Sequence, residues 1–181
     1  MRVLSFNLRN ANAKDGPNAW DERTEAVADV WRAIDADLAG IQEGYLRQVR
    51  FLEERFPGYL RLGVGRDGGE NGEHSAIFVR RDRFRVLAHG DFWLSDTPEV
   101  PASKHWGNNC VRMATWAHLR DHEGGELLYL NTHLDHEAPQ ARVKGAELIC
   151  SFLAERSGDR PVVVTGDFNE RPEGETVRTF L

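Results

Sequence analysis

The sequence predicts a mixed α/β fold in which two packed mixed β-sheets are flanked by helices, and three observations support this class. Predicted strands outnumber predicted helices along the 181 residues. Some neighbouring strands are joined by short turns, as in hairpins, whereas others are separated by helical segments. Two sheets packed face to face, with helices outside them, would bury this many strand faces. The length and the 40% hydrophobic content fit a single domain over residues 1–181.

The first half of the chain alternates strands and helices. Residues 2–8 alternate so that Leu4, Phe6 and Leu8 share one face, which is typical of a half-buried strand. Asp21 is a candidate cap for a helix. The apolar stripe expected on that helix is Val27, Val30, Trp31 and Ile34. The elements expected next are a strand at 38–43, a helix at 46–56, a strand at 59–65, a loop at 66–73 and a strand at 74–81.

The second half is richer in strands. The elements expected there are a strand at 84–95, a long surface loop at 96–110, a hairpin of strands at 111–121 and 126–134, a helix at 138–156 and a strand at 161–168. The run of valines in "PVVVTGDFN" predicts that this last strand is buried. The final "TVRTFL" has the pattern of the middle of a helix whose apolar side chains need cover.

Composition excludes several classes of protein. The net charge of −6 lacks the cationic excess of a non-specific nucleic-acid binder, although it permits a phosphate-bearing substrate bound through a metal. Cys110 and Cys150 are too few for a disulfide framework and are expected to be reduced thiols. No apolar run is long enough to span a membrane, and the N-terminus lacks the pattern of a signal peptide. We therefore expect a cytoplasmic protein.

Polar residues recur where the predicted strands end. These residues are Asn7, Gln42 with Glu43, Asn131 with His133, and Asp167 with Asn169. Each alone is better explained as a turn or a solvated strand end. Together they suit a hard cation, because Mg²⁺ prefers oxygen ligands and keeps several waters, so Glu43 with Asn7 would make an open site. Zinc fits less well, because the histidines lack a paired spacing beside cysteines.

The order of the motifs resembles that of a known family. "SFNLR", "IQE", "GEHSAIFVRRDRF", "NTHLDH" and "TGDFN" are similar to the successive motifs of the metal-dependent endonuclease/exonuclease/phosphatase superfamily, and the likeness covers nearly the whole chain. "DFWLSDTPEVPASKHW" and "VRMATW" resemble a bacterial branch of it. The resemblance implies a deoxyribonuclease I-like four-layer sandwich and the hydrolysis of phosphate esters with Mg²⁺, or with Mn²⁺ in its place.

The resemblance also implies roles for particular residues. Glu43 and Asn7 match the metal-site positions, and Asp167 and Asn169 match the pair that orients or deprotonates the attacking water. His133 matches the histidine that contacts the scissile phosphate. Arg112 matches a phosphate-side arginine and Glu73 a mid-chain polar position, and surface ion pairing explains both equally well. Trp106 in the 96–110 loop would either stack on a substrate ring or pin the loop to the sandwich.

One part of the family pattern is missing. Family members end with further strands and an Asp-His dyad after the "GDFN" motif, and this chain stops before that point. Asp121-His122 and Asp135-His136 precede the motif and do not replace the dyad. We therefore expect the 181 residues to be a C-terminally truncated portion of a longer enzyme that lacks its last strands.

Two functions from different classes remain open at this point. The first is a phosphodiesterase or phosphatase that acts by metal-assisted in-line attack of water. Its substrate would be a phosphorylated small molecule, a lipid headgroup or a nucleic acid, and no obligate protein partner is evident. The second is a catalytically inactive binding module of the same fold that recognises phosphorylated ligands or a protein partner. Retention of Glu43, Asp167, Asn169 and His133 favours the enzyme, and the missing dyad favours the module.

Overall fold

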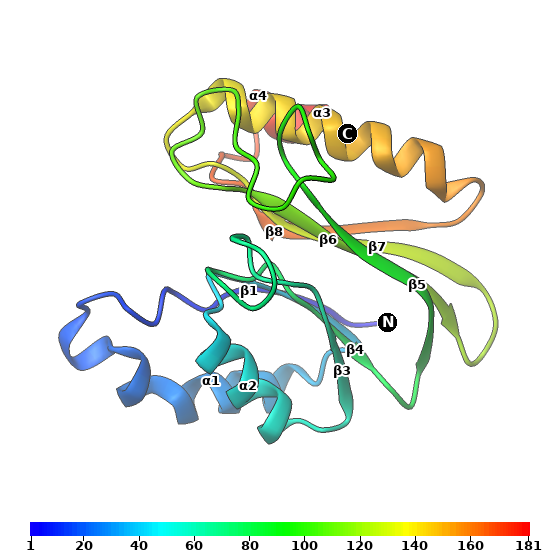
Figure 1. The fold of residues 1–181 in the computed structure, drawn as a ribbon. Helices are drawn as coiled ribbons and strands as arrows, with labels where there is room; N and C mark the ends of the chain where they lie inside the picture. The colour runs from blue at the N-terminus through cyan, green and yellow to red at the C-terminus, as the bar shows by residue number, and fades with distance from the viewer.

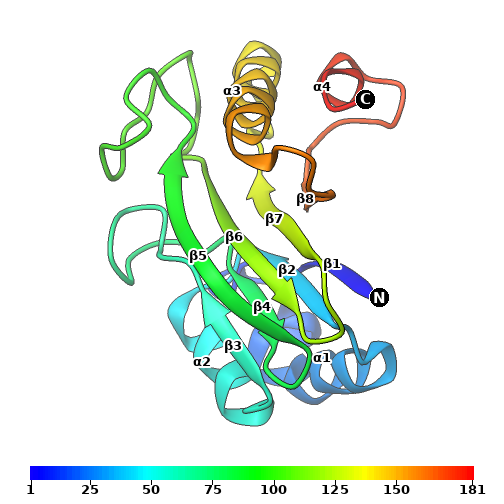
Figure 2. The same cartoon turned by 90° about the vertical axis from the view of Figure 1, so that its right-hand side faces the viewer.

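Two four-stranded β-sheets lie face to face between two layers of helices (Figures 1 and 2). The computed structural model describes residues 1–181. The elements of its first half are β1 (Val3–Asn7), a 3₁₀ turn (Gly16–Asn18), α1 (Trp20–Ile34), β2 (Leu38–Gln42), α2 (Leu46–Arg55), β3 (Tyr59–Leu62) and β4 (Ile77–Arg80). Those of the second half are β5 (Phe84–Trp93), β6 (Met113–Asp121), β7 (Glu126–His133), α3 (Pro139–Ser157), β8 (Val162–Asp167) and α4 (Glu175–Thr179). The predicted fold class is confirmed.

Each sheet contains one parallel pair of strands that is joined through a helix. The first sheet has the order β1-β2-β4-β3, and β1 runs parallel to β2 with α1 as the crossover. The second has the order β5-β6-β7-β8, and β7 runs parallel to β8 with α3 as the crossover. The register pairs Asn7 with Gln42 in the first sheet and His133 with Asp167 in the second. The carboxyl ends of these four strands therefore carry the polar residues that the sequence singles out.

Three apolar clusters separate the four layers. The first lies between the α1 and α2 helices and their sheet, around Trp31 and Phe78. The second lies between the two sheets, around Ile77 and Tyr129. The third lies between the second sheet and α3, around Leu130 and Ile149. This layering follows from the alternation along the strands, because successive side chains of a strand enter the cores on opposite faces of its sheet.

A buried polar network fastens the two sheets together. The Asn131 amide nitrogen on β7 donates to the carbonyls of Ile41 (2.8 Å) and Ala76 (3.1 Å) in the first sheet. Its oxygen accepts from Gln42 Nε2 (2.8 Å) and Thr165 Oγ1 (3.0 Å). Asn131 is fully buried, so its four hydrogen bonds are made inside the sandwich. This residue is structural and does not belong to the cation site that its position at a strand end suggested.

Helix α1 begins earlier than predicted and buries a narrower face. Its N-cap is Ala19, which makes no side-chain cap, and Asp21 lies in the first turn instead. The earlier start brings Trp20 into the core, where its ring packs edge-on against Phe51 at 5.5 Å. The expected stripe is wrong at two positions, because Val30 and Ile34 are exposed. Ile34 is the last helical residue, next to the left-handed cap at Asp35.

The last strand and the C-terminal helix also differ from expectation. β8 pairs only with β7 and forms an edge of its sheet, so Val162 is exposed although the valine run predicted a buried strand. The predicted strands at 59–65 and 74–81 are shorter, because regular pairing is confined to β3 and β4. The final helix α4 has five residues and ends before Phe180, whose ring stacks on Phe168 at 4.9 Å.

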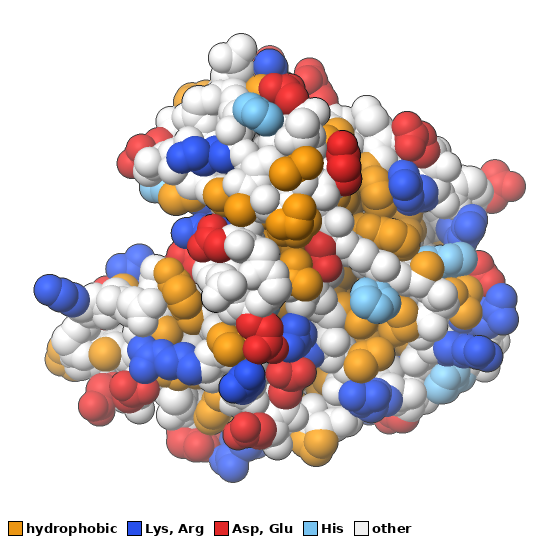
Figure 3. All heavy atoms as spheres, viewed as in Figure 1, with side chains coloured by type: hydrophobic (Ala, Val, Ile, Leu, Met, Phe, Trp, Pro, Cys, Tyr) orange, Lys and Arg blue, Asp and Glu red, His pale blue; other side chains and the backbone are white.

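The outer face of the second sheet is partly uncovered. Hydrophobic side chains gather around β5 and beneath α3 in the space-filling view (Figure 3). Phe92, Trp116 and Phe152 line a groove of about 500 Å³ there. A second groove, of about 540 Å³, lies beside β8 and α4. None of the helices combines the length and the apolar character that a membrane crossing requires.

Candidate active site

The five residues predicted to form the site lie together at one rim of the sandwich. Asn7 ends β1, Glu43 directly follows β2, His133 ends β7 and Asp167 ends β8, with Asn169 two residues later. The two sheets meet here, since Asn7 Nδ2 of the first sheet donates to Asp167 Oδ2 of the second at 3.0 Å. The predicted convergence of distant segments is present in the structure.

The amide of Asn7 links the two carboxylates of the site. Its nitrogen donates to Glu43 Oε1 at 2.8 Å as well as to Asp167 Oδ2. Its oxygen accepts from the backbone N–H of Arg9 at 2.8 Å. The other oxygen of Glu43 accepts from the backbone N–H of Asn10 at 2.7 Å. Glu43 has a φ of 58°, a left-handed conformation that is costly for a non-glycine residue and that turns the chain sharply away from β2.

Asp167 and Asn169 are brought together by a turn. The strand ends at Asp167, and Asn169 has a φ of 49°, so a turn and not an extended strand places the two side chains near each other. The turn is held by Asp167 Oδ1, which accepts from the backbone N–H of Asn169 at 3.0 Å. The Asn169 side chain then donates to the Leu134 carbonyl and lies 3.0 Å from His133 Nε2. The pair is therefore fixed against the histidine that ends the neighbouring strand.

The electrostatic environment keeps His133 neutral and Asp167 ionised. Burial, with Arg112 nearby, lowers the pKa of His133 to about 4, against the opposing effect of Asp167. Burial opposes ionisation of Asp167, but the hydrogen bonds from Asn7 and from the Asn169 backbone outweigh it and lower the pKa of that carboxyl. At neutral pH His133 Nε2 can therefore accept the Asn169 amide, and Asp167 carries a full negative charge.

The donor set suits a hard cation. No group of three or more histidine, cysteine or acidic side chains is clustered in a way that could hold a metal ion. The carboxylates of Glu43 and Asp167 nevertheless lie within hydrogen-bond reach of the same amide nitrogen, that of Asn7. Mg²⁺ takes oxygen ligands and commonly uses only one or two carboxylates, with water for the rest. The side chains present therefore fit Mg²⁺ or Mn²⁺ better than zinc.

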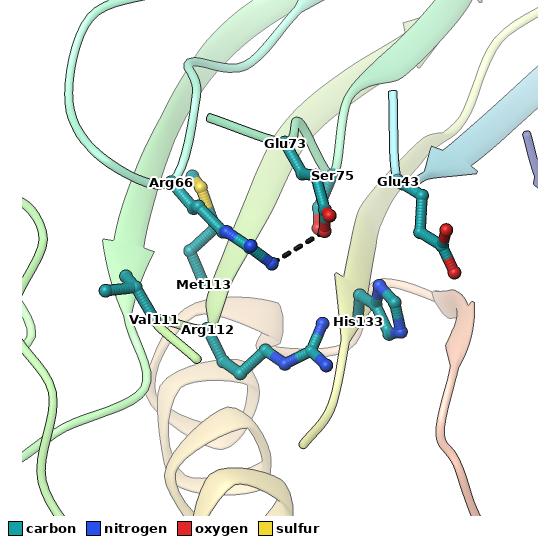
Figure 4. Close-up of a pocket in the computed structure, with 8 residues that line it drawn as sticks. All are labelled: Glu43, Arg66, Glu73, Ser75, Val111, Arg112, Met113 and His133. Carbon is teal, nitrogen blue, oxygen red and sulfur yellow. Dashed lines mark hydrogen bonds and ion pairs between the residues drawn. The ribbon is translucent and has the colours of Figure 1, made fainter. Parts of the chain in front are cut away.

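A small cavity beside these residues is lined by charged side chains (Figure 4). It measures about 10 Å³, close to the smallest space that holds one water molecule. Its charged or titratable lining residues are Glu43, Arg66, Glu73, Arg112 and His133. Two of the three predicted substrate-side residues, Arg112 and Glu73, are therefore next to the site.

Arg112 is a buried cation that no carboxylate pairs. It is 4% exposed, and its only side-chain hydrogen bond runs from Nη2 to His136 Nδ1 at 3.1 Å. Its Nε is buried with no partner. Burial and the nearby Arg66 lower the pKa of Arg112, which shows how unfavourable the charge is here. Leaving a buried charge unpaired lowers the free energy of unfolding by several kcal/mol, about 3–5 when one partner of a buried pair is removed. A bound anion beside Arg112 would offset this loss.

Trp106 does not reach the cavity. Its indole N–H donates to Asp96 Oδ1 at 2.6 Å, and the Lys144 ammonium lies 5.6 Å from the centre of its ring. Trp106 also packs against the apolar cluster between the second sheet and α3. The structure therefore gives Trp106 the second of its two predicted roles, that of pinning the 96–110 loop.

Arg66 and Asn10 are site residues that the sequence did not indicate. Arg66 lies in the glycine-rich loop that follows β3, where no periodicity marks any side chain. Its backbone N–H donates to the Glu73 carbonyl at 2.9 Å, which closes the loop over residues 66–73. Asn10 contributes a backbone N–H, which no side-chain pattern reveals. The only signal for Asn10 is its place three residues after Asn7, in the loop that leaves the first strand.

Comparison with known proteins supports the family resemblance that the sequence motifs indicate. The sequence profile described as the Endonuclease/Exonuclease/phosphatase family matches residues 4–181. A curated relative, "Carbon catabolite repressor protein 4 homolog 3" of Arabidopsis thaliana, is 25% identical over 161 residues, which are 85% of this chain and 34% of that protein. The chain thus spans about one third of the length of this relative.

Two solved bacterial structures share more sequence identity with this chain than the Arabidopsis relative does. An endonuclease/exonuclease/phosphatase protein from Bacteroides vulgatus has a TM-score of 0.95 and 37% identity, with 98% of this chain and 69% of that chain covered. A mannosyl-6-phosphatase from Bacteroides thetaiotaomicron has a TM-score of 0.94 and 41% identity, with 100% and 70% covered. The expectation that further strands follow in a longer enzyme stays a prediction. The profile match over almost the whole length, with these likenesses, shows that the chain belongs to the Endonuclease/Exonuclease/phosphatase family.

Proposed function

We propose that this protein hydrolyses a phosphate ester with the help of Mg²⁺ or Mn²⁺. The observation that carries the proposal is the meeting of Asn7, Glu43 and Asp167 through one amide, next to the unpaired cation of Arg112. The site thus presents negative oxygens on one side and a positive charge on the other. A cation and a phosphate group would together neutralise both.

Glu43, with Asn7, is the proposed holder of the metal. Asn7 now directs its nitrogen at the carboxylates, so ligation by its oxygen would require the amide to turn and give up the hydrogen bond from Arg9. When bound, the cation would supply positive charge beside the phosphoryl oxygens and so favour attack at phosphorus. The backbone N–H of Asn10 keeps the Glu43 carboxylate directed into the site.

The remaining groups of the site handle the water and the developing charge. Asp167, ionised at neutral pH, accepts a proton from the attacking water. Its lowered pKa makes it a weak base, so much of its contribution is to orient the water. Arg112 donates to oxygens on which negative charge grows. The two N–H groups of the Asn169 amide donate to the Leu134 carbonyl and to neutral His133, so Asn169 holds the imidazole in place beside the site.

The proposed substrate class follows from the positively charged part of the site, where an anion would bind. Arg112 lines a small cavity together with His133 and Glu43, so a phosphoryl oxygen that entered it would contact the guanidinium. One of the two similar bacterial structures is a mannosyl-6-phosphatase, which favours a phosphorylated sugar or another small phosphate ester. The net charge of −6 argues in the same direction and against duplex nucleic acid.

The test is metal-dependent turnover of two chromogenic substrates, p-nitrophenyl phosphate and bis(p-nitrophenyl) phosphate. We expect hydrolysis of at least one of them with Mg²⁺ or Mn²⁺ and none with EDTA. Asp167→Asn should lower kcat by about 10²- to 10⁴-fold, the usual contribution of a positioned acid or base. The matched control is Asp159→Asn, which removes an exposed carboxylate and should retain wild-type turnover. Wild-type turnover by Asp167→Asn would show that the proposed role of this residue is wrong.

The alternative is a binding module without activity, and the buried charge of Arg112 alone would support it. Such a module would bind inorganic phosphate and would release no nitrophenol under any metal condition. Failure of Arg112→Ala to weaken phosphate binding would argue against both readings, because both place the anion at Arg112.

A further inference from the structure

We propose that Arg66 selects phosphate monoesters over phosphate diesters by binding a terminal phosphoryl oxygen that only a monoester presents. This inference rests on the proposed function and names its substrate class more closely. The observations that carry it are the position of Arg66 beside Arg112 in the lining of one cavity, the hydrogen bonds that hold Arg66, and the donors that both side chains leave free.

Hydrogen bonds hold Arg66 in place at the start of the 66–73 loop. Its backbone N–H donates to the Glu73 carbonyl, and its own carbonyl accepts the indole N–H of Trp93 at 2.6 Å. Its Nη1 donates to Glu73 Oε2 at 2.6 Å, and the other Glu73 oxygen accepts from Asn10 Nδ2 at 3.2 Å. Both oxygens of Glu73 are therefore engaged, so Glu73 positions Arg66 and has little capacity left to contact a substrate.

Most hydrogen-bond donors of Arg66 remain available. A guanidinium carries five N–H donors, and the side chain of Arg66 uses only Nη1, toward Glu73. Figure 4 shows the Arg66 and Arg112 side chains extending into the same space, with Glu73 and His133 on its far side. Two arginines that face one cavity, with most of their donors free, form a site for an anion with several acceptor oxygens.

Charge and the number of terminal oxygens separate the two kinds of ester. The cavity is small and is lined by both arginines, so it suits a compact anionic group. A monoester has three terminal oxygens and a charge of about −1.5 to −2 at pH 7, so one oxygen can enter the cavity while the others face the metal side. A diester has two terminal oxygens and a single negative charge, so it offers the two arginines fewer acceptors and less charge.

The experiment measures the ratio of kcat/KM for p-nitrophenyl phosphate to that for bis(p-nitrophenyl) phosphate with Mg²⁺. We expect the wild type to favour the monoester and Arg66→Ala to lower this ratio by about 10- to 100-fold, as expected for the loss of one charge-assisted hydrogen bond. Arg66→Gln, which can still donate to Glu73, should lower it similarly if the fold is kept. Arg50→Ala is the matched control, because Arg50 is an exposed arginine that pairs with Glu70 of the same loop.

A binding measurement separates the inference from the proposed function. Inorganic phosphate should raise the Tm of the wild-type chain more than dimethyl phosphate does, and Arg66→Ala should remove that difference. Equal losses on both esters, or a wild type that favours the diester, would overturn the selection by Arg66 and leave the hydrolase intact. No metal-dependent hydrolysis of either ester would reject the proposed function, and the two phosphate ligands would still decide the role of Arg66.

Discussion

His133 is the residue whose burial most shapes the chemistry of the site. It is 7% exposed and lies between Asn169, the Asp167 carboxylate at 3.9 Å and the guanidinium of Arg112. A charged imidazole here would lose its hydration and face Arg112, so the neutral ring is favoured. Neutral His133 can hold Asn169 through Nε2, which a protonated ring could not do.

The lowered pKa of His133 predicts how stability depends on pH. The unfolded chain takes up this proton near the ordinary histidine value of about 6.5, and the native state takes it up only near 4. The unfolded state therefore binds more protons between these values, and the free energy of unfolding should fall as the pH drops from about 6.5 to about 4. Below that window His133 contributes no further loss.

Urea unfolding at a series of pH values checks this dependence. His133→Gln should show a shallower fall across the window than the wild type does, because one of the contributing histidines is gone. Burial also lowers the pKa of His74, so part of the fall should remain. An unchanged slope in His133→Gln would mean that His133 is not buried as a neutral ring.

At the scale of elements, β2 is an inner strand of the first sheet that packs tightly against the second sheet. It lies between β1 and β4 in the first sheet, and Gly40 at its centre faces the second sheet. A Cβ atom at Gly40 would overlap the oxygens of Thr165 and Asn131. The absence of a side chain therefore allows the Asn131 amide to approach the first sheet and reach its carbonyls.

Gly40→Ala should destabilise the protein by about 1–3 kcal/mol or more, since the added methyl group overpacks a rigid core and disturbs the Asn131 hydrogen bonds. Chemical denaturation measures the loss. The matched control is Gly58→Ala, where an added Cβ meets no atom within 4 Å. Similar stabilities for the two variants would contradict the tight contact between the sheets at this point.

The order and the type of the elements could be predicted from the sequence, whereas their limits and exposure could not. Period-two and helical patterns identify elements one at a time, and they describe only which faces are apolar. They did not show that β8 is an edge strand, because a valine run looks the same at an edge and in the centre of a sheet. Nor did they show the start of α1, where burial of Trp20 outweighs the capping preference of Asp21.

At the scale of the whole molecule, the site is a consequence of two parallel crossovers that face each other. Each sheet places the ends of one parallel pair at the same rim, and packing of the sheets brings the two pairs of ends together. Strand-end polarity and the family resemblance therefore sufficed to predict that Asn7, Glu43, His133, Asp167 and Asn169 lie together, whereas their catalytic roles stay a prediction. Arg66 could not be predicted this way, because it reaches the site through the closure of a loop without periodicity.

The central claim is that Glu43 and its neighbours form one cation-assisted site, and Mn²⁺ binding measured by isothermal titration calorimetry tests it most directly. We predict that the wild-type chain binds Mn²⁺ at one site and that Glu43→Gln weakens this binding by at least about tenfold. Glu155→Gln, which alters an exposed carboxylate elsewhere, should bind as the wild type does. Wild-type Mn²⁺ affinity in Glu43→Gln would contradict the account.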